Sequence, residues 1–293
     1  MDLTNLDTIK NIIKDNRLWP KKGYGQNFLI SRNALNIIIE SAQITSDDTI
    51  VEIGPGLGTL TQELAKNAKL VLALESDYNL VTYLRKYFKS AKNIKIIHQD
   101  VLTYDLRLMT NDYKLVSNLP YNISSPVIRK FLESQINADL DTDADQRGNN
   151  KLQCMVLMLQ KEVAERLTAK PGSADRGILT VMVELFGGAE IIENVSRKSF
   201  YPIPDVDSAI IKININTKKL KNSKILDTKA LMQFVKIGFS QKRRQIHHPL
   251  ADNLHLPTDQ IKDILKSVNI DLVLRAEDLN IDQWISLYKK VFN

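Results

Sequence analysis

The segment TIVEIGPGLGT, residues 49–59, joins a short apolar run to a glycine-rich loop. Residues 49–53 are mostly apolar and β-branched and stop at Gly54, which predicts a buried strand. Glycines recur at alternate positions up to Gly58, and an amphipathic helical pattern follows to about Ala68. A strand, a tight glycine turn and a helix in this order are typical of open α/β sheets, whose ligands bind at the carboxyl ends of the strands.

The alternation of strand and helix patterns continues along the chain. Further strands, separated by helices, are predicted for the apolar runs 69–74, 94–97, 115–117 and 152–159. Such alternation predicts a parallel sheet with right-handed crossovers. The closing runs 189–196 and 207–215 have no helix between them, which predicts an antiparallel final pair.

Beyond a lysine-rich linker at 217–224 the pattern predicts helices only. We therefore expect the α/β class, with a Rossmann-like, mostly parallel seven-stranded sheet and an N-terminal helix over residues 1–217. A small all-α domain is expected over residues 218–293. Residues 137–150 contain four aspartates and little that is apolar, which predicts a solvated insertion with no function that the pattern identifies.

The composition predicts a soluble, cytoplasmic protein. The chain has 293 residues, of which 43% are hydrophobic, and a mean hydropathy of −0.21, and no apolar run is long enough for a membrane span. The N-terminus carries aspartates on an amphipathic pattern, which argues against a signal peptide or a mitochondrial presequence. The single cysteine, Cys154, excludes an internal disulfide and is consistent with a reducing compartment.

The net charge of +6 is unevenly distributed along the chain. Residues 212–244 contain ten lysines and arginines and one acid, Asp227. Basic residues concentrated in one segment are the footprint expected for a polyanionic partner. A solvated surface without a partner would show the same pattern.

The predicted strand ends carry residues suited to a nucleoside. Gly54 follows the first strand, Glu75 the second and Asp100 the third. A carboxylate at the second tip can accept both ribose hydroxyls, and one at the third can accept from an adenine amino group. Each acid alone would more often be a surface residue or a helix cap, but their occurrence at successive tips favours a site.

The glycine loop departs from the dinucleotide fingerprint. Thr59 stands where that fingerprint has its last glycine, and the loop has no arginine or lysine that would hold a pyrophosphate. A nucleoside without phosphates therefore fits better than NAD, and S-adenosylmethionine is such a ligand.

A second candidate site follows the strand at 115–117. Asn118, Leu119, Pro120 and Tyr121 offer an amide oxygen, a backbone carbonyl that precedes a proline, and an aromatic face. This set suits a planar base with an exocyclic amine. Two acceptors on the amine of adenine would localise its lone pair and orient it toward an electrophile.

Several motifs together resemble the ribosomal RNA adenine N6,N6-dimethyltransferase family. The matching stretches are GQNFL at 25–29, VEIGPG at 51–56, NLPYNIS at 118–124, LQKEVA at 159–164 and FYPIPDVDSA at 200–209. The resemblance implies a class I methyltransferase domain followed by a small helical domain. It also implies S-adenosylmethionine-dependent dimethylation of two adjacent adenosines in a hairpin loop of the small-subunit 16S rRNA, during ribosome biogenesis.

The resemblance assigns roles to named residues. It implies a cofactor site made of Gln26, Asn27, Leu29, Gly54, Gly56, Glu75, Asp100 and Asn118. It implies that the target adenine is held by Asn118, Leu119 and Pro120, stacked on Tyr121 and closed off by Phe200. RNA contacts are expected at Lys21, Lys22, Lys242, Arg243 and Arg244, and no metal is expected. The implied partner is small-subunit rRNA within a pre-30S-type particle, bound by a monomer.

The sequence departs from the family's pattern at residues 247–249, where His-His-Pro replaces the usual arginine and asparagine. We expect these histidines on the surface, because no neighbouring cysteine completes a metal site. Arg176 stands where relatives usually carry tyrosine, in a loop expected to border the target site.

Other functions remain alternatives at this point. A 23S rRNA adenine N6-methyltransferase of the macrolide-resistance type shares most of these motifs, but LRAEDL at 274–279 resembles the small-subunit enzymes more. A non-catalytic RNA-binding assembly factor on the same scaffold is a second alternative, and a dinucleotide oxidoreductase is a distant third.

Overall fold

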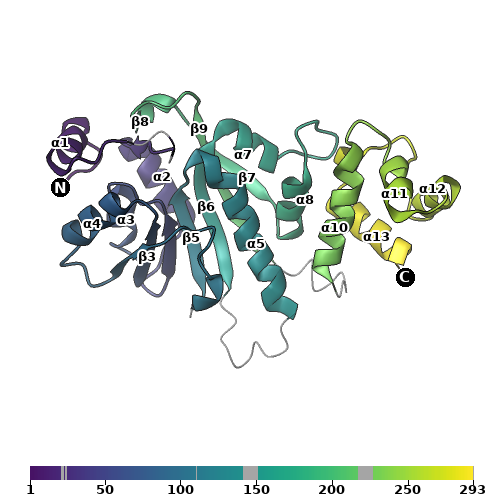
Figure 1. The fold of residues 1–293 in the computed structure, drawn as a ribbon, viewed down its shortest axis with the longest axis horizontal. Coiled ribbons are helices and arrows are strands. Elements are labelled where there is room, and N and C mark those ends of the chain that lie inside the picture. The colour runs from purple at the N-terminus through teal and green to yellow at the C-terminus, as the bar shows by residue number, and fades with distance from the viewer. Residues whose placement is uncertain (21–22, 24, 110, 141–150, 217–226, 293) are drawn as a thin grey trace. The chain divides into compact units, whose positions relative to one another are not determined.

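The computed structural model describes residues 1–20, 23, 25–109, 111–140, 151–216 and 227–292 (Figure 1). The predicted RNA contacts Lys21 and Lys22 and most of the acidic insertion at 137–150 lie outside the described residues. The predicted domain boundary between residues 217 and 218 also lies outside them and stays a prediction. The described chain divides into two compact units, the first comprising Met1–Ala164 and Glu190–Ile215.

A seven-stranded sheet forms the centre of the first unit, with the strand order β4-β3-β2-β5-β6-β9-β7. Its strands are β2 (Thr49–Ile53), β3 (Leu70–Glu75), β4 (Ile94–His98), β5 (Tyr113–Asn118), β6 (Leu152–Gln160), β7 (Ala189–Val195) and β9 (Ser208–Asn214). The pairs from β4 to β6 are parallel, and β9 lies antiparallel to β6. The predicted fold class, a mostly parallel seven-stranded α/β sheet followed by helices, is confirmed.

Helices cover both faces of this sheet because strand side chains alternate between them. In β5, Val116 packs with Leu35 and Ile38 of α2 (Arg32–Ala42) and with residues of α3 (Thr59–Leu64). Tyr113 of β5 packs on the other face of the sheet, where its ring contacts Phe131 of α5 (Ser124–Leu140) edge to face. Figure 1 shows α5 in front of the strands.

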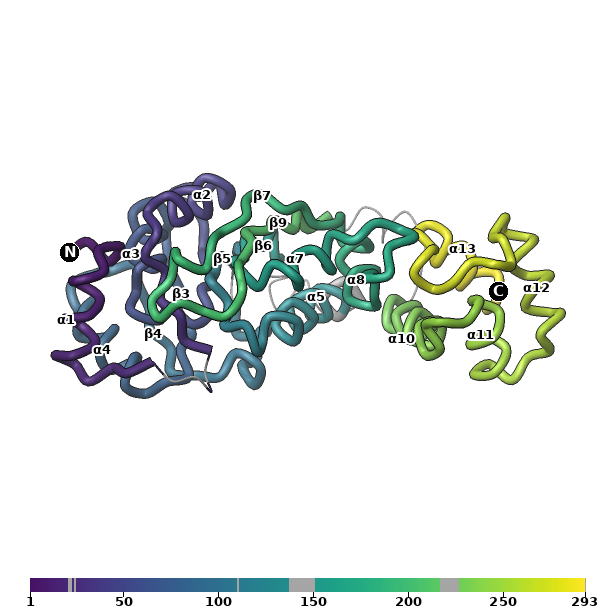
Figure 2. The backbone as a smooth tube through the Cα atoms, turned by 90° about the horizontal axis from the view of Figure 1, so that it is seen from above, coloured from purple at the N-terminus to yellow at the C-terminus, as the bar shows by residue number. Residues whose placement is uncertain are grey.

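Two further helices complete this unit. The N-terminal helix α1 (Leu6–Asn16) begins at Asn5, whose side chain accepts from the Thr8 amide at 3.0 Å. It shares a buried cluster with α4 (Tyr78–Tyr87), beside which it lies in Figure 2, and with Phe28. The predicted N-terminal amphipathic helix therefore packs against the sheet domain.

A short two-stranded ribbon, formed by β1 (Phe28–Leu29) and β8 (Phe200–Tyr201), lies outside the main sheet. The strands are antiparallel, with Leu29 opposite Phe200. The ribbon joins the loop that precedes β1 to a segment about 170 residues later, a pairing that the sequence patterns did not indicate.

The second unit comprises residues 165–189 and 216–293, of which the structure describes all but 217–226 and 293. Helix α7 (Lys161–Leu167) leads into it. Its other helices are α8 (Ile178–Leu185), α10 (Thr228–Gly238), α11 (His247–Leu254), α12 (Thr258–Ser267) and α13 (Ile281–Phe292). Trp284 is fully buried against Phe234 and Phe239, and a β-carbon at Gly238 would lie 2.3 Å from its ring.

The expected surface position of the histidines is wrong for His247. This residue is 5% exposed, because it opens α11 on the side that packs inward, and its ring lies 4.2 Å from that of His248. Burial lowers the pKa of His247, so the buried ring is held neutral. No helix among the described residues is long and apolar enough to cross a membrane.

Candidate active site

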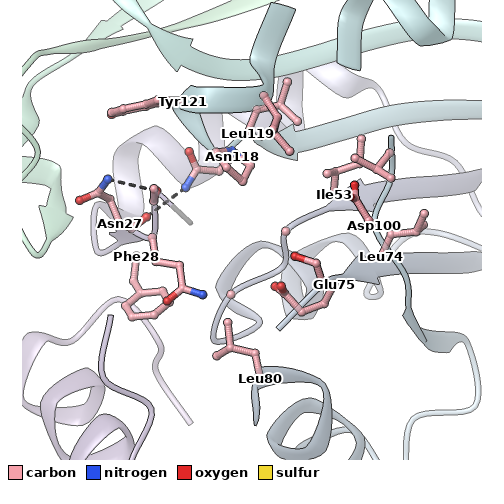
Figure 3. A pocket seen from close by; sticks show the side chains of 18 of the residues that line it. Asn27, Phe28, Ile53, Leu74, Glu75, Leu80, Asp100, Asn118, Leu119 and Tyr121 are labelled. Atoms are coloured by element: carbon pink, nitrogen blue, oxygen red, sulfur yellow. Dashed lines mark hydrogen bonds between the residues drawn. The ribbon is translucent and has the colours of Figure 1, made fainter. Parts of the chain in front are cut away.

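A pocket of about 680 Å³, open to solvent, lies at the carboxyl ends of β2, β3 and β5 (Figure 3). The sequence predicted many of its lining residues, namely Gln26, Asn27, Gly54, Gly56, Glu75, Asp100, Asn118, Leu119, Pro120, Tyr121 and Phe200. It did not single out the apolar and polar residues Phe28, Ile53, Leu74, Ser76, Leu80, Gln99, Val101 and Ile123, although most of them directly adjoin a predicted site residue.

The glycine loop after β2 is built for close approach of the backbone to its surroundings. Gly54 and Gly56 have φ values of +64° and +58°, which side-chain-bearing residues rarely adopt. A β-carbon at Gly54 would lie 3.2 Å from Pro120, and one at Gly56 would lie 3.1 Å from the Phe28 ring. The loop therefore packs against both the β5 turn and the segment leading into β1.

Glu75 is the last residue of β3 and is 5% exposed. Its Oε1 accepts from the Asp77 amide at 2.9 Å, and the amides of Ser76 and Gly56 also donate to the carboxyl group. Burial raises the pKa of Glu75, while these amides oppose the rise. The Glu75 carboxyl group is therefore a buried hydrogen-bond acceptor with a fixed orientation at the end of β3.

Asp100 follows β4 and is exposed at the pocket's edge. One carboxylate oxygen accepts from the Leu102 amide at 2.8 Å, which fixes the side chain in a tight turn. Val101, which follows Asp100, and Leu80 are 3% and 2% exposed and line the same pocket, so the carboxylates of Asp100 and Glu75 share it with apolar side chains. Apolar surface flanked by acceptors is suited to a planar, amine-bearing ring.

The end of β5 carries Asn118, whose side-chain amide lines the pocket. The side-chain amide of Asn118 donates to the Asn27 carbonyl at 3.4 Å, and the Asn27 amide donates in turn to the Gly25 carbonyl at 3.3 Å (Figure 3). This orientation leaves the Asn118 Oδ1 as an acceptor. The Leu119 amide donates to the Met158 carbonyl at 3.0 Å, which holds the turn on the end of the neighbouring strand β6.

Two aromatic side chains border the same end of the pocket. Tyr121 opens the short 3₁₀ helix η3 (Tyr121–Ile123), and its hydroxyl lies 2.6 Å from the Ser208 hydroxyl. Phe200 is 1% exposed in β8, where the pairing with β1 holds it. Sequence reasoning assigned no role to Ser208, since a buried serine at the start of a strand carries no distinctive pattern.

Some predicted site residues do not line the pocket. Leu29 is 4% exposed in the main hydrophobic core, next to the lining residue Phe28. Lys242, Arg243 and Arg244 lie exposed in the second unit, where the Lys242 ammonium donates to the Ala174 carbonyl at 2.5 Å.

Arg176 is also part of the second unit and has a structural environment there. It is 1% exposed, and its guanidinium pairs with Glu184 and donates to the carbonyls of Ala169 and Leu279, each at 3.1 Å. The expectation that this position affects substrate handling stays a prediction.

The described residues contain no group of histidine, cysteine, aspartate or glutamate side chains arranged to hold a metal ion. What the pocket offers instead is a set of fixed hydrogen-bond acceptors, a close backbone loop and aromatic faces. Such a site can hold a nucleoside beside a second planar base.

Comparison with known proteins agrees with this geometry. The chain is 41% identical to "Ribosomal RNA small subunit methyltransferase A" of Fusobacterium nucleatum, over 92% of this chain and 96% of that protein. Its structure is similar to that of a dimethyladenosine transferase from Plasmodium falciparum, with a TM-score of 0.73, 26% identity and coverage of 90% and 98%. It is also similar to the 23S rRNA methyltransferase ErmE, with a TM-score of 0.69, 25% identity and coverage of 91% and 100%.

The family profile described as "Ribosomal RNA adenine dimethylase" matches residues 19–292, which is nearly the whole chain. The match includes both the pocket at the ends of the strands and the basic residues 242–244. The chain belongs to the ribosomal RNA adenine dimethylase family.

Proposed function

We propose that this protein dimethylates N6 of two adjacent adenosines in a hairpin loop of small-subunit rRNA, with S-adenosylmethionine as the methyl donor. The observation that carries this proposal is the oriented Asn118 amide at the end of β5, between the Glu75 and Asp100 acceptors on one side and Tyr121 on the other. One pocket thus holds the acceptors for a nucleoside next to those for an exocyclic amine.

The residues of the pocket fit the proposed donor. The Asp77 amide orients the Glu75 carboxyl at the end of β3, where the carboxylate can accept from ribose hydroxyls. The turns at Gly54 and Gly56 bring the backbone to a place that a β-carbon would crowd. The adenine ring would pack on the apolar side chains of Leu80 and Val101, with Asp100 accepting from its amino group.

S-adenosylmethionine, when bound, supplies a methyl group on a positively charged sulfur, which is already activated for transfer. The chain's part is therefore to position the accepting nitrogen in line with that methyl group. The Asn118 Oδ1 and the Leu119 carbonyl accept the two N–H groups of the target adenine, which localises the nitrogen lone pair. As positive charge develops on that nitrogen, both oxygens stabilise it.

The target adenine needs a stacking surface because N6 is inaccessible while the base is paired and stacked in RNA. Tyr121 provides one face for a base that has left the helix, and Phe200 closes the other side. Stacking on an aromatic ring is worth roughly 1–3 kcal/mol per base. This energy offsets part of the cost of unstacking the base.

The choice of small-subunit rRNA rests on the curated relatives, which carry that substrate in their names at 35–41% identity over almost the full chain. The 23S rRNA enzyme ErmE is the main alternative, since its structure is nearly as similar. The proposal takes the partner to be a pre-30S-type particle in the cytoplasm and the enzyme to act as a monomer. The exposed Lys242, Arg243 and Arg244 would bind phosphates of that particle.

The experiment is methyl transfer from labelled S-adenosylmethionine to isolated 30S-type particles, free 16S rRNA and free 23S rRNA, with modified positions mapped by primer extension. Two methyl groups on N6 remove both N–H donors, so reverse transcription stops at each product. The proposal expects stops at two adjacent adenosines in small-subunit rRNA. Stops in 23S rRNA would favour the ErmE-like alternative, and no transfer to any substrate would favour a non-catalytic assembly factor.

A further inference from the structure

The hydroxyl of Tyr121 and the hydroxyl of Ser208 lie 2.6 Å apart, within hydrogen-bond distance, although the residues are 87 positions apart in the chain. Ser208 is fully buried, whereas the Tyr121 ring is half-buried and lines the pocket. Burial raises the pKa of Tyr121, so the phenol keeps its proton at neutral pH. A buried hydroxyl therefore holds the far end of the ring that faces the pocket.

The surroundings of Ser208 hold its hydroxyl in place. Ser208 is the first residue of β9 and pairs with Gln160 at the end of β6. The preceding Asp207 accepts through its carbonyl from the Lys161 amide at 3.0 Å and through its carboxylate from the Arg197 amide at 2.9 Å. The anchor belongs to a regular strand that is fixed on both sides, so it cannot follow the ring if the ring turns.

The strand order shows that this hydrogen bond links two strands that are not neighbours in the sheet. Tyr121 starts from the end of β5, and Ser208 stands in β9, with β6 between the two strands. The side chain therefore reaches across the end of β6 and is held at both ends, at its Cα by the turn after Pro120 and at its hydroxyl by β9. Figure 3 shows the ring as a flat surface beside Asn118. The anchor opposes rotation of Tyr121 about its χ1 angle, since such rotation would carry the hydroxyl away from Ser208.

We propose that Ser208 is a positioning residue for methyl transfer, which holds the Tyr121 ring in place through its hydroxyl and thereby sets the position of the target base. This inference rests on the proposed function, because it takes the base to stack on Tyr121. A base that stacks on a displaced ring would present its amine off the line of transfer, and small misplacements of reacting atoms cost rate. The loss should appear in kcat more than in KM, since a displaced ring still offers a stacking face.

The test uses the full-length enzyme with Ser208→Ala, Tyr121→Phe and the double variant, assayed for methyl transfer to small-subunit particles. Each single variant should lower kcat by about 3- to 10-fold, the loss expected if one neutral hydrogen bond acts fully on the transition state. The double variant should lose no more than either single variant, because both remove the same bond. KM for the particle and the dissociation constant for S-adenosylmethionine should change by less than twofold.

Ser196→Ala is a matched control, because Ser196 is an exposed serine outside the pocket whose hydroxyl accepts only a local amide. It should leave kcat unchanged. The inference is overturned if Ser208→Ala and Tyr121→Phe have full activity, if their losses add in the double variant, or if Ser208→Ala weakens cofactor binding and activity together.

Tyr121→Ala distinguishes the two proposals, since it removes the ring itself. If this variant is inactive while the hydroxyl variants are fully active, the result supports stacking of the base on Tyr121 and refutes the anchoring role of Ser208. If Tyr121→Ala turns over normally, the proposed use of Tyr121 fails, and the inference fails with it.

Discussion

The side-chain amide of Asn118 donates to the backbone carbonyl of Asn27 across 3.4 Å, which joins the end of β5 to a loop 91 residues earlier. This contact decides which atom of Asn118 faces a ligand. Because the nitrogen is used within the protein, the oxygen remains for an N–H donor in the pocket. A side chain with two acceptors and no donor would lose this orientation.

Asn118→Asp should therefore abolish most activity even though the two side chains have the same shape. The substitution replaces the N–H donor with an oxygen that faces the Asn27 carbonyl oxygen, and the two acceptors repel each other. Loss of one preorganised polar group at a reacting centre costs roughly 100- to 1,000-fold in kcat. Single-turnover methyl transfer measures the loss, and a melting temperature within a few degrees of wild type shows that folding is intact.

Gly54→Ala should weaken cofactor binding through crowding in addition to backbone strain. A β-carbon there would lie 3.2 Å from Pro120 in the turn that carries Asn118, at a φ of +64°. Strain alone costs roughly 1–2 kcal/mol. Gly172→Ala is the control, because Gly172 has a φ of +89° but no atom within 4 Å of the added carbon. Titration calorimetry should show weaker S-adenosylmethionine binding for Gly54→Ala and not for Gly172→Ala. Equal affinities of the two variants for S-adenosylmethionine would contradict the expected effect of crowding at Gly54.

Glu52→Gln should make stability less dependent on pH. Glu52 is 2% exposed beneath the glycine loop, where burial raises its pKa to about 8 and the Thr61 hydroxyl donates to it at 2.6 Å. The unfolded chain loses this proton near pH 4.5, whereas the folded chain keeps it up to about pH 8. Wild-type stability should therefore fall as pH rises through this window, by at most about 1.4 kcal/mol per pH unit.

Denaturant unfolding of both proteins between pH 5 and 9 measures the effect of this substitution. Glu52→Gln should gain stability over wild type up to about pH 8, above which the difference should stay constant. The exposed Glu40→Gln is the control and should follow wild type throughout. A pH-independent difference between Glu52→Gln and wild type would show that Glu52 is ionised in the folded chain.

The pocket-lining residues that follow strands could be predicted from the sequence, because a residue directly after a parallel strand lies at the carboxyl edge of the sheet. Gly54, Glu75, Asp100 and Asn118 each follow a strand whose apolar pattern is clear, and parallel strands bring their carboxyl ends to one edge. The order of the strands did not need to be known in detail for these residues to converge.

Features that depend on long-range pairing were not predictable in the same way. The β1–β8 ribbon has strands of two residues each, too short for any periodic pattern, yet it sets the wall formed by Phe28 and Phe200. The burial of His247 depends on how α11 packs, and polar residue type gave the wrong expectation. Ser208 acquires its contact with Tyr121 only when β9 inserts between β6 and β7.

The basic residues at the start of the α11 segment should contribute to RNA affinity through charge. Arg243 and Arg244 are exposed in the turn between η5 (Phe239–Gln241) and α11, whereas the Lys242 ammonium already donates to the Ala174 carbonyl. Replacing both arginines with alanine should weaken particle binding and make it less sensitive to salt. The slope of log K against log salt is negative, and each lost phosphate contact reduces its magnitude by about 0.7–0.9.

Lys266→Ala is the matched control for this experiment, because Lys266 is an exposed cation of the same helical unit that pairs with Asp263 on its own helix. Binding to small-subunit particles is measured at several salt concentrations for all three proteins. The arginine variant should bind particles more weakly and with a smaller dependence of log K on log salt. Its kcat at saturating particle should stay near wild type, since no reacting group is removed. Equal losses for Lys266→Ala would mean that overall charge, and not the turn at 243–244, determines the affinity.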